Sequence, residues 1–398
     1  MGGDGRLSIA DFQNVTKRWV PQAIVADLLM HAGAIFAVYL LVAGGFHIPD
    51  LFTPLSFGLT ILGFVAMFLV GFAILSTIFP RHYIKREKLK YRWVFTGLAL
   101  SFVGATGAFT VLVSALTAFS MGMWALAYAL YWIRVLGITI GYHRLPTHQA
   151  FRAGKVFKRF IFYCGAAARQ QTVRWWGGEH LIHHDQTEIE SRDPHTPRQK
   201  PLKFLHAHFE WVWYQFVYPD SIWYAKQYSK GLEDDPLVKE QKKYYWPVMV
   251  LGFILPLMIF WPLGGFWHGF VAFNLCLLSF IASHNVTMTV NSWSHTWGPQ
   301  YYKGKKTGDS TDPWYLALFS AGENLQNIHH LMDFLACYWI DIKHPDYSGA
   351  IIVALEKIGR LRWMKWVGLP YDLNTLADKP IRLKFLLEHQ ISEEVGNR

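Results

Sequence analysis

Long apolar stretches with few charges alternate along the chain with polar segments. Six stretches reach or approach the roughly 20 mostly apolar residues that a membrane-spanning helix needs. They cover residues 24–43, 55–79, 93–118, 121–142, 246–266 and 267–290. Arg134 and His284 lie near one end of the fourth and sixth stretches, where a polar side chain can reach the interface or a binding site. The pattern predicts an all-α integral membrane protein with about six transmembrane helices.

The charges of the connecting segments predict the orientation of these helices. Residues 46–54 contain no Lys or Arg, whereas residues 81–92 contain six. The stretch 143–245 and the residues after Val290 are also basic, and all basic segments fall on the same side of an even number of spans. Both termini are therefore expected in the cytoplasm. The alternative is that one or two of the apolar stretches are buried core helices.

Composition narrows the class of protein further. Hydrophobic residues make up 52% of the 398 residues and charged residues only 17%, below the quarter that is usual in soluble proteins. The three cysteines form no CxxC pair, which argues against a disulfide framework or a zinc ribbon. The net charge of +10, together with the apolar stretches, indicates a membrane protein with a basic face rather than a nucleic-acid-binding protein.

Eight of the 18 histidines fall into four short clusters at or just beyond the cytoplasmic side of the predicted spans. The clusters are His143 with His148; His180, His183 and His184; Asn291 with His295; and Gln326 with His329 and His330. Positions i, i+3 and i+4 share one face of a helix, so each of the last three clusters can converge on one site. His143 and His148 are five residues apart, and Pro146 predicts that the helix bends or ends between them, which would let both face a common centre.

Imidazole suits iron, copper, zinc and nickel. Eight imidazoles are too many for one ion and about right for two. The sequence contains neither the HExxH motif nor a set of cysteines that would indicate a zinc site instead. The sequence therefore predicts a histidine-rich dimetal site in a cytosolic helical cap formed by residues 1–20, 143–245 and 291–398. A single histidine at a membrane edge is more often a hydrogen-bonding interface residue. The other ten histidines are interpreted in that way, with His195 as a partial exception.

The four clusters, in their order and separation, resemble the histidine boxes of membrane fatty acyl desaturases. HRLPTH, EHLIHH, NSWSH and QNIHH are most similar to the stearoyl-CoA-type pattern HxxxxH, HxxHH, NxxxH and HNxHH. The second box also carries the downstream Asp193-Pro194-His195, and the third carries a Gly322-Glu323 lead. The similarity runs from about residue 93 to residue 335.

The resemblance implies two Fe²⁺ ions and O₂ as co-substrate, with removal of two vicinal hydrogens from an acyl chain at the expense of external electrons. Asn291 resembles the family asparagine that holds a metal-bound water. Gln326 stands where the acyl-CoA enzymes have histidine, and front-end desaturases carry glutamine there. Gln326 is therefore expected to bind a metal or its water.

Two further sets of residues are expected around the metals. Carboxylates next to the boxes are candidates to accept the second ring N–H of a ligand histidine, with solvated surface residues as the alternative; they are Glu179, Asp185, Glu323 and Asp333. Aromatic residues near the boxes are candidates for the wall of an acyl-chain tunnel, with membrane-interface anchors as the alternative; they are Trp175, Trp176, Trp293 and Trp297.

The resemblance also divides the chain. Residues 93–335 correspond to a desaturase core of four transmembrane helices and the cap, residues 1–92 add two spans that the family core lacks, and residues 336–398 form a cytosolic tail. The implied partners are membrane lipid, a fatty acyl substrate (acyl-CoA, acyl-lipid or free fatty acid) and an electron donor (ferredoxin, rubredoxin or a b-type cytochrome with its reductase). The implied location is a bacterial inner membrane or the endoplasmic reticulum, with the active site in the cytoplasm.

Other functions share the same metal site. A fatty acyl hydroxylase, a ketolase or a decarboxylase that forms a terminal alkene would begin with the same hydrogen abstraction. A non-catalytic membrane receptor or scaffold with a structural metal is a further alternative from another class of protein.

Overall fold

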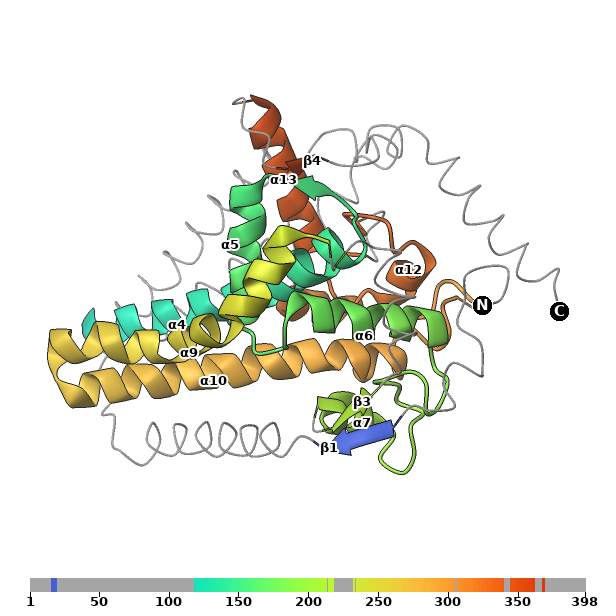
Figure 1. Ribbon diagram of the computed structural model, residues 1–398, viewed down its shortest axis with the longest axis horizontal. Helices are drawn as coiled ribbons and strands as arrows, with labels where there is room; N and C mark the ends of the chain where they lie inside the picture. Colours follow the sequence, from blue (N-terminus) through green and yellow to red (C-terminus); the bar gives the residue numbers. More distant parts are fainter. Residues whose placement is uncertain are drawn as a thin grey trace, which may run out of the picture.

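The structure is a computed structural model that describes residues 118–212, 214–217, 232, 234–304, 306–339 and 344–361, with two strand segments at 16–19 and 367–368. The described part is mostly helical (Figure 1). Its strands form two short antiparallel pairs, β1 (Thr16–Trp19) with β3 (Tyr214–Val217) and β2 (Arg152–Ala153) with β4 (Val367–Gly368). The predicted spans at 24–43 and 55–79, and all but the last residue of the span at 93–118, lie outside the described residues.

Three long apolar helices run alongside one another. They are α4 (Ala118–Leu136) with its continuation η3 (Gly137–Thr147), α9 (Pro236–Gly264) and α10 (Phe266–Asn291) (Figure 1). Three segments within them, Ala125–Thr147, Pro236–Gly264 and His268–His295, are long and apolar enough to cross a membrane. They match the fourth, fifth and sixth predicted spans, so helices of spanning length are confirmed at these three places.

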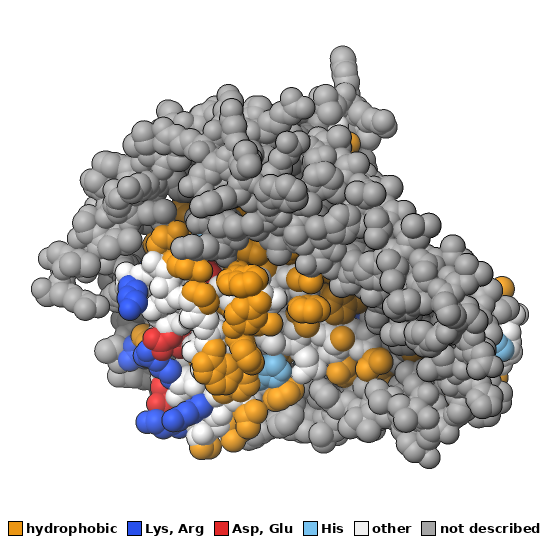
Figure 2. All heavy atoms as spheres, turned by 180° about the vertical axis from the view of Figure 1, so that it is seen from behind, with side chains coloured by type: hydrophobic (Ala, Val, Ile, Leu, Met, Phe, Trp, Pro, Cys, Tyr) orange, Lys and Arg blue, Asp and Glu red, His pale blue; other side chains and the backbone are white. Residues whose placement is uncertain are grey.

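Much of the exposed surface of these helices is apolar, apart from the first two turns of α9, where Lys239, Lys242 and Lys243 are exposed. On α9, for example, Trp246 is 66% exposed and Leu263 is 61% exposed. Figure 2 shows apolar side chains running in a band across the described part of one face, with the charged side chains gathered to one side of the band. A bilayer favours long helices with an apolar exterior. The bilayer core offers no hydrogen-bond partner, and a helix satisfies its backbone polar groups internally.

The helix η3 is a π-helix, and it ends where the sequence predicted a bend or an end. It continues through Pro146 to Thr147, so it ends between His143 and His148. A π-helix pairs residues five apart, and the His148 N–H donates to the His143 carbonyl at 3.1 Å. The rings of His143 and His148 meet edge to face at 4.8 Å. The expected end of the helix is therefore confirmed, while the π-type pairing that brings the two side chains together was not predicted.

Shorter helices surround the end of the bundle that carries the histidines. They are α5 (Lys155–Ala166), α6 (Val173–Gln186), α7 (Phe204–His208), η4 (Glu210–Val212), η5 (Trp293–His295), η6 (Trp314–Leu316), α11 (Ala317–Ser320), α12 (Gln326–Leu331) and α13 (Tyr347–Leu361). The α5 helix lies directly against η3, where a Cβ on Gly137 would come within 2.3 Å of the Cys164 backbone. Glycine there allows the close approach that positions the first two histidines.

The described residues beyond 335 pack onto the core. Arg144, on η3, donates to the Asp346 carboxylate at 2.8 Å and to the Ala336 carbonyl at 3.2 Å. All the atoms of this ion pair are buried. This pair connects the start of α13 to the π-helix, although the division of the chain at residue 335 itself stays a prediction.

Candidate metal centre

The eight clustered histidines come together in two adjacent groups. Cluster A contains His143, His148, His180, His184 and His329, and cluster B contains His183, His295 and His330. Within each cluster one ring nitrogen from every histidine lies within 4.8 Å of the others. The rings of His184 and His330 stack at 4.4 Å, so the two clusters adjoin.

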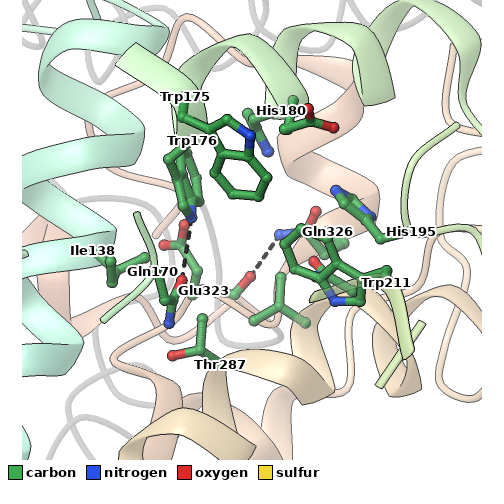
Figure 3. A pocket seen from close by; sticks show the side chains of 13 residues that line it. Ile138, Gln170, Trp175, Trp176, His180, His195, Trp211, Thr287, Glu323 and Gln326 are labelled. Atoms are coloured by element: carbon green, nitrogen blue, oxygen red, sulfur yellow. Dashed lines mark hydrogen bonds between the residues drawn. The ribbon is translucent and has the colours of Figure 1, made fainter. Parts of the chain in front are cut away.

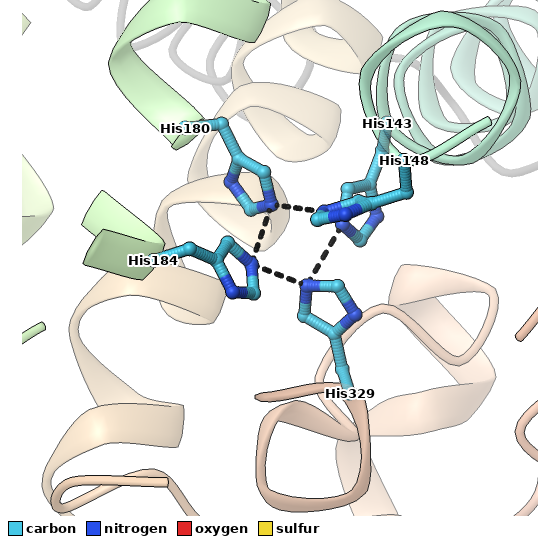
Figure 4. Close-up of side chains that lie close together, drawn as sticks. All are labelled: His143, His148, His180, His184 and His329. Atoms are coloured by element: carbon cyan, nitrogen blue, oxygen red, sulfur yellow. Dashed lines mark hydrogen bonds between the residues drawn. The ribbon is translucent and has the colours of Figure 1, made fainter. Parts of the chain in front are cut away.

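In cluster A the imidazoles present the same atom to the centre. The Nε2 atom of His180 lies 2.9 Å from that of His148 and 3.0 Å from that of His184 (Figure 4). The Nε2 atom of His329 lies 2.8 Å from that of His184 and 3.0 Å from that of His143. The five side chains thus direct one ring nitrogen each to a common centre.

Cluster B repeats the arrangement with fewer imidazoles. The Nε2 atoms of His183 and His330 are 3.1 Å apart. The ring of His295 lies 4.9 Å from the ring of His183 and 5.0 Å from that of His330. His195, beyond this cluster, places its ring 4.2 Å from that of His183.

The helices α6 and α12 each serve both clusters. The i, i+3, i+4 spacing predicted one site for His180, His183 and His184, but His183 lies in cluster B and the other two lie in cluster A. A shift of one helical position turns a side chain by about 100°, which is enough to direct neighbouring residues to two centres only a few ångströms apart. His329 and His330 on α12 are divided in the same way.

The outward-facing Nδ1 atoms of several ligand candidates meet acceptors. His183 Nδ1 lies 2.9 Å from both oxygens of Asp193, and His295 Nδ1 lies 2.7 Å from Glu188. His143 Nδ1 contacts the Glu323 carboxylate. A carboxylate accepts a hydrogen bond from Nδ1–H, which leaves the lone pair of Nε2 free for the centre of the cluster.

Burial favours the neutral form of five of these imidazoles. Their pKa values are lowered well below the ordinary value, first by burial and then by the neighbouring histidines; they are His180, His183, His184, His329 and His330. A neutral imidazole can offer the lone pair of one ring nitrogen to a metal ion. Two groups of converging ring nitrogens therefore fit two divalent metal ions of the kind that imidazole prefers.

Two of the four predicted carboxylates lie beside ligand candidates. Glu323 contacts His143, and Asp333 lies 3.7 Å from His148 Nδ1. Asp185 instead accepts a hydrogen bond from Gln186. Glu179 is buried and lines a pocket next to the clusters.

Three partners of the histidines were not predicted. Asp193 was noted only as part of Asp-Pro-His, without a role. Glu188 and Tyr338 were not noted at all. Glu188 lies just beyond the end of helix α6. Tyr338 lies nine residues after His329, and no helical spacing relates these two residues. The Tyr338 hydroxyl lies 2.7 Å from His329 Nδ1.

A pocket lies beside His180 of cluster A and His195 (Figure 3). Of the four predicted wall residues, Trp175 and Trp176 line it, and Trp176 stacks on His180 at 4.8 Å while donating to Gln170 at 3.1 Å. Trp293 and Trp297 are not among its lining residues: Trp293 donates to the Tyr315 hydroxyl, and Trp297 is 49% exposed.

Gln326 and Asn291 also line this pocket. The Gln326 side chain is 2% exposed and donates from Nε2 to the Glu323 carbonyl at 2.7 Å. It also interacts with His295, a member of cluster B. Because its amide nitrogen is directed at a backbone carbonyl, its amide oxygen is the atom that remains for the cluster.

Replacing Asp193 by asparagine is expected to weaken metal binding at cluster B by about 10- to 100-fold, the usual effect of losing a charged partner of a ligand histidine. Metal titration in the presence of a competing chelator measures this change. Asp309→Asn is the control, because Asp309 pairs with Arg198 at the exposed surface. An unchanged affinity in Asp193→Asn would contradict the orienting role of Asp193.

Comparison with known proteins agrees with this site. The fatty acid desaturase family profile matches residues 122–351, which is more than half of the chain. Delta-9 acyl-lipid desaturase 2 of Arabidopsis thaliana is 30% identical over 69% of this chain and 86% of its own length. The sn-1 stearoyl-lipid 9-desaturase of Anabaena variabilis is 30% identical over 68% of this chain and 93% of its own length. Acyl-CoA Delta-12 desaturase of Tribolium castaneum is 30% identical over 64% of this chain and 68% of its own length.

Proposed function

Because the chain belongs to the fatty acid desaturase family and is an oxidoreductase that acts on acyl chains, we propose that it is a membrane-bound di-iron desaturase. It removes two vicinal hydrogens from a fatty acyl chain with O₂ and external electrons. The observation that supports this proposal most directly is the convergence of eight imidazoles into two adjacent clusters beside a pocket.

The five imidazoles of cluster A would hold one metal ion. The three of cluster B would hold the other, with Gln326, or a water on Asn291, completing its ligands. When bound there, two iron ions supply the one-electron O₂ chemistry that an unactivated methylene C–H bond requires, because no acidic, basic or nucleophilic side chain can attack such a bond. Ligation mainly by imidazole, without carboxylates, differs from the glutamate-rich sites of soluble di-iron bundles.

The residues of the chain itself hold the substrate. Ile138, Val290 and the indoles of Trp175 and Trp176 give part of the pocket an apolar wall that favours a methylene chain. His180 lies in the wall of the same pocket, so an acyl chain that occupies it passes next to cluster A. The matched relatives carry their acyl chains on lipid or on CoA. We extend that substrate class, and free fatty acids, to this chain, with a ferredoxin, a rubredoxin or a b-type cytochrome as electron donor.

The test of this function is mass spectrometry of the lipids, fatty acids and free hydrocarbons of a host that expresses the chain. A new double bond in an acyl chain is the expected product. A hydroxy or keto acid, or a terminal alkene one carbon shorter, would replace this proposal with the corresponding alternative. Absence of O₂ consumption by the iron-loaded protein with a reductant would favour a non-catalytic receptor or scaffold.

The proposed topology has six spans, both termini in the cytoplasm and the metal clusters on the cytoplasmic side. Residues 1–92 supply the two additional spans, and residues 336–398 form a cytosolic tail. In this arrangement the turn between α9 and α10 lies outside and the segment between α6 and α7 lies inside.

Cysteine labelling in intact cells or spheroplasts checks this topology. A cysteine at Leu263 is expected to react with a membrane-impermeant reagent, whereas a cysteine at Lys200 is expected to react only after permeabilisation. The three native cysteines are buried, so the background is low. Labelling of Lys200→Cys from outside would contradict both the topology and the route for electrons from a cytosolic donor.

A further inference from the structure

His329, a ligand candidate of cluster A, has a different outer partner from three other ligand candidates of the two clusters. The Nδ1 atoms of His143, His183 and His295 each contact a carboxylate. His329 instead meets the phenol of Tyr338, at 2.7 Å between Nδ1 and the hydroxyl oxygen. Both side chains are fully buried. The difference is one of charge, since a phenol is neutral at pH 7 and a carboxylate is not.

Tyr338 is held in place by contacts that do not involve the histidines. The guanidinium of Arg144 lies over its ring, 4.2 Å from the ring centre. Its backbone N–H donates to the Asp346 carboxylate at 2.7 Å, and the same carboxylate accepts from Arg144. The phenol oxygen is therefore fixed from the π-helix and from the start of α13.

The direction of the hydrogen bond between His329 and Tyr338 follows from the role of the other ring nitrogen of His329. His329 Nε2 is the atom that faces the cluster, 2.8 Å from the Nε2 of His184 and 3.0 Å from that of His143. A ring that ligates through Nε2 carries its hydrogen on Nδ1, so Nδ1 donates to the Tyr338 oxygen. Hydrogen bonds to a neutral acceptor are about half as strong as those to a charged one.

We propose that Tyr338 is a positioning residue that fixes His329 in cluster A and makes it a weaker electron donor to the metal than the carboxylate-linked histidines. The proposal rests on the metal sites of the proposed function. A weaker donor stabilises the higher oxidation state of a metal less, so the phenol raises the reduction potential of cluster A above the value that a carboxylate in its place would give.

The experiment compares Tyr338→Phe with Tyr245→Phe in the full-length protein in detergent or nanodiscs. Phenylalanine keeps the ring under Arg144 and removes only the acceptor. Tyr245→Phe removes another buried hydroxyl, which accepts from the Gln171 backbone at 3.1 Å and contacts no ligand histidine. Anaerobic Fe²⁺ titration against a chelator gives the dissociation constants, and a redox titration gives the potentials.

In Tyr338→Phe one of the two Fe²⁺ dissociation constants is expected to rise by about 10- to 100-fold while the other stays unchanged. The reduction potential of one centre is expected to rise as well, because the orphaned Nδ1–H makes His329 a still weaker donor. Incorporation of 3-fluorotyrosine at Tyr338, which preserves size and weakens the oxygen as an acceptor, should shift the potential in the same direction by less.

Equal dissociation constants and potentials in wild type and Tyr338→Phe would overturn the proposal. It would also be overturned if Tyr245→Phe weakened iron binding as much as Tyr338→Phe, because the effect would then be one of general stability. These readouts need no product. A wild-type protein that binds two irons but forms no desaturated product would therefore contradict the proposed function and leave the role of Tyr338 to be decided by the titrations.

Discussion

Replacing His183 by alanine is expected to abolish product formation and to lower the iron content from about two ions per chain to about one. His183 supplies one of only three imidazoles to cluster B, and its Nδ1 contact with Asp193 shows that its orientation is fixed for that purpose. Loss of an outer partner of a ligand typically costs 10- to 100-fold in activity or metal affinity, so loss of the ligand itself should cost at least about 100-fold. Iron analysis of the purified protein and mass spectrometry of its products measure the two effects.

His268→Ala is the matched control. His268 lies in the first turn of α10, at the opposite end of the helix from His295, and is exposed. The control should insert into the membrane, bind two irons and form product at close to the wild-type rate. An equal loss of activity in both variants, or two irons in His183→Ala, would contradict the assignment of cluster B.

Gln326→Ala is expected to remove most of the activity, at least about tenfold, and to loosen the iron of cluster B. An amide oxygen is a weaker ligand than an imidazole nitrogen, but Gln326 is 2% exposed, lines the pocket and interacts with His295, so its loss opens a place beside the metal. Gln326→His should keep two irons, because imidazole restores the ligand of the stearoyl-CoA-type pattern, while the reactivity of the centre changes. Turnover and iron content measured side by side in the three proteins test this.

A surface residue that only begins helix α12 would behave differently. Exposed substitutions of that kind rarely change stability by more than about 0.5 kcal/mol, and activity would remain. Wild-type turnover and iron content in Gln326→Ala would therefore show that the amide does not act at the metal. The ligands of cluster B would then be three histidines and a water.

The gathering of the eight histidines could be predicted from the sequence because metal coordination demands particular residue types at helical spacings. His180, His183 and His184 could be recognised as a set from their spacing alone. Their division between two clusters could not, because the spacing constrains the face of a helix to within about a quarter turn, and two centres a few ångströms apart lie within that range. The division depends on where α12 brings His329 and His330.

The outer partners of the histidines were harder to predict for a related reason. Glu188 and Tyr338 reach His295 and His329 through the tertiary fold, across 107 and 9 residues of sequence. Carboxylates adjacent to a box are near a ligand in sequence but point where their own helix directs them, so Glu323 contacts His143 while Asp185 accepts from Gln186. Apolar periodicity, by contrast, predicted the three described spans because the bilayer imposes one length on every helix that crosses it.

The π-helix at the end of α4 makes the length of this segment critical for the site. It pairs residues five apart, and in that register His143 and His148 lie on the same side. In an α-helix, the insertion or deletion of one residue rotates all the side chains that follow by about 100° relative to the transmembrane segment. A change of length in this segment would therefore leave a helix that still suits the bilayer but directs His148 away from the other histidines of cluster A.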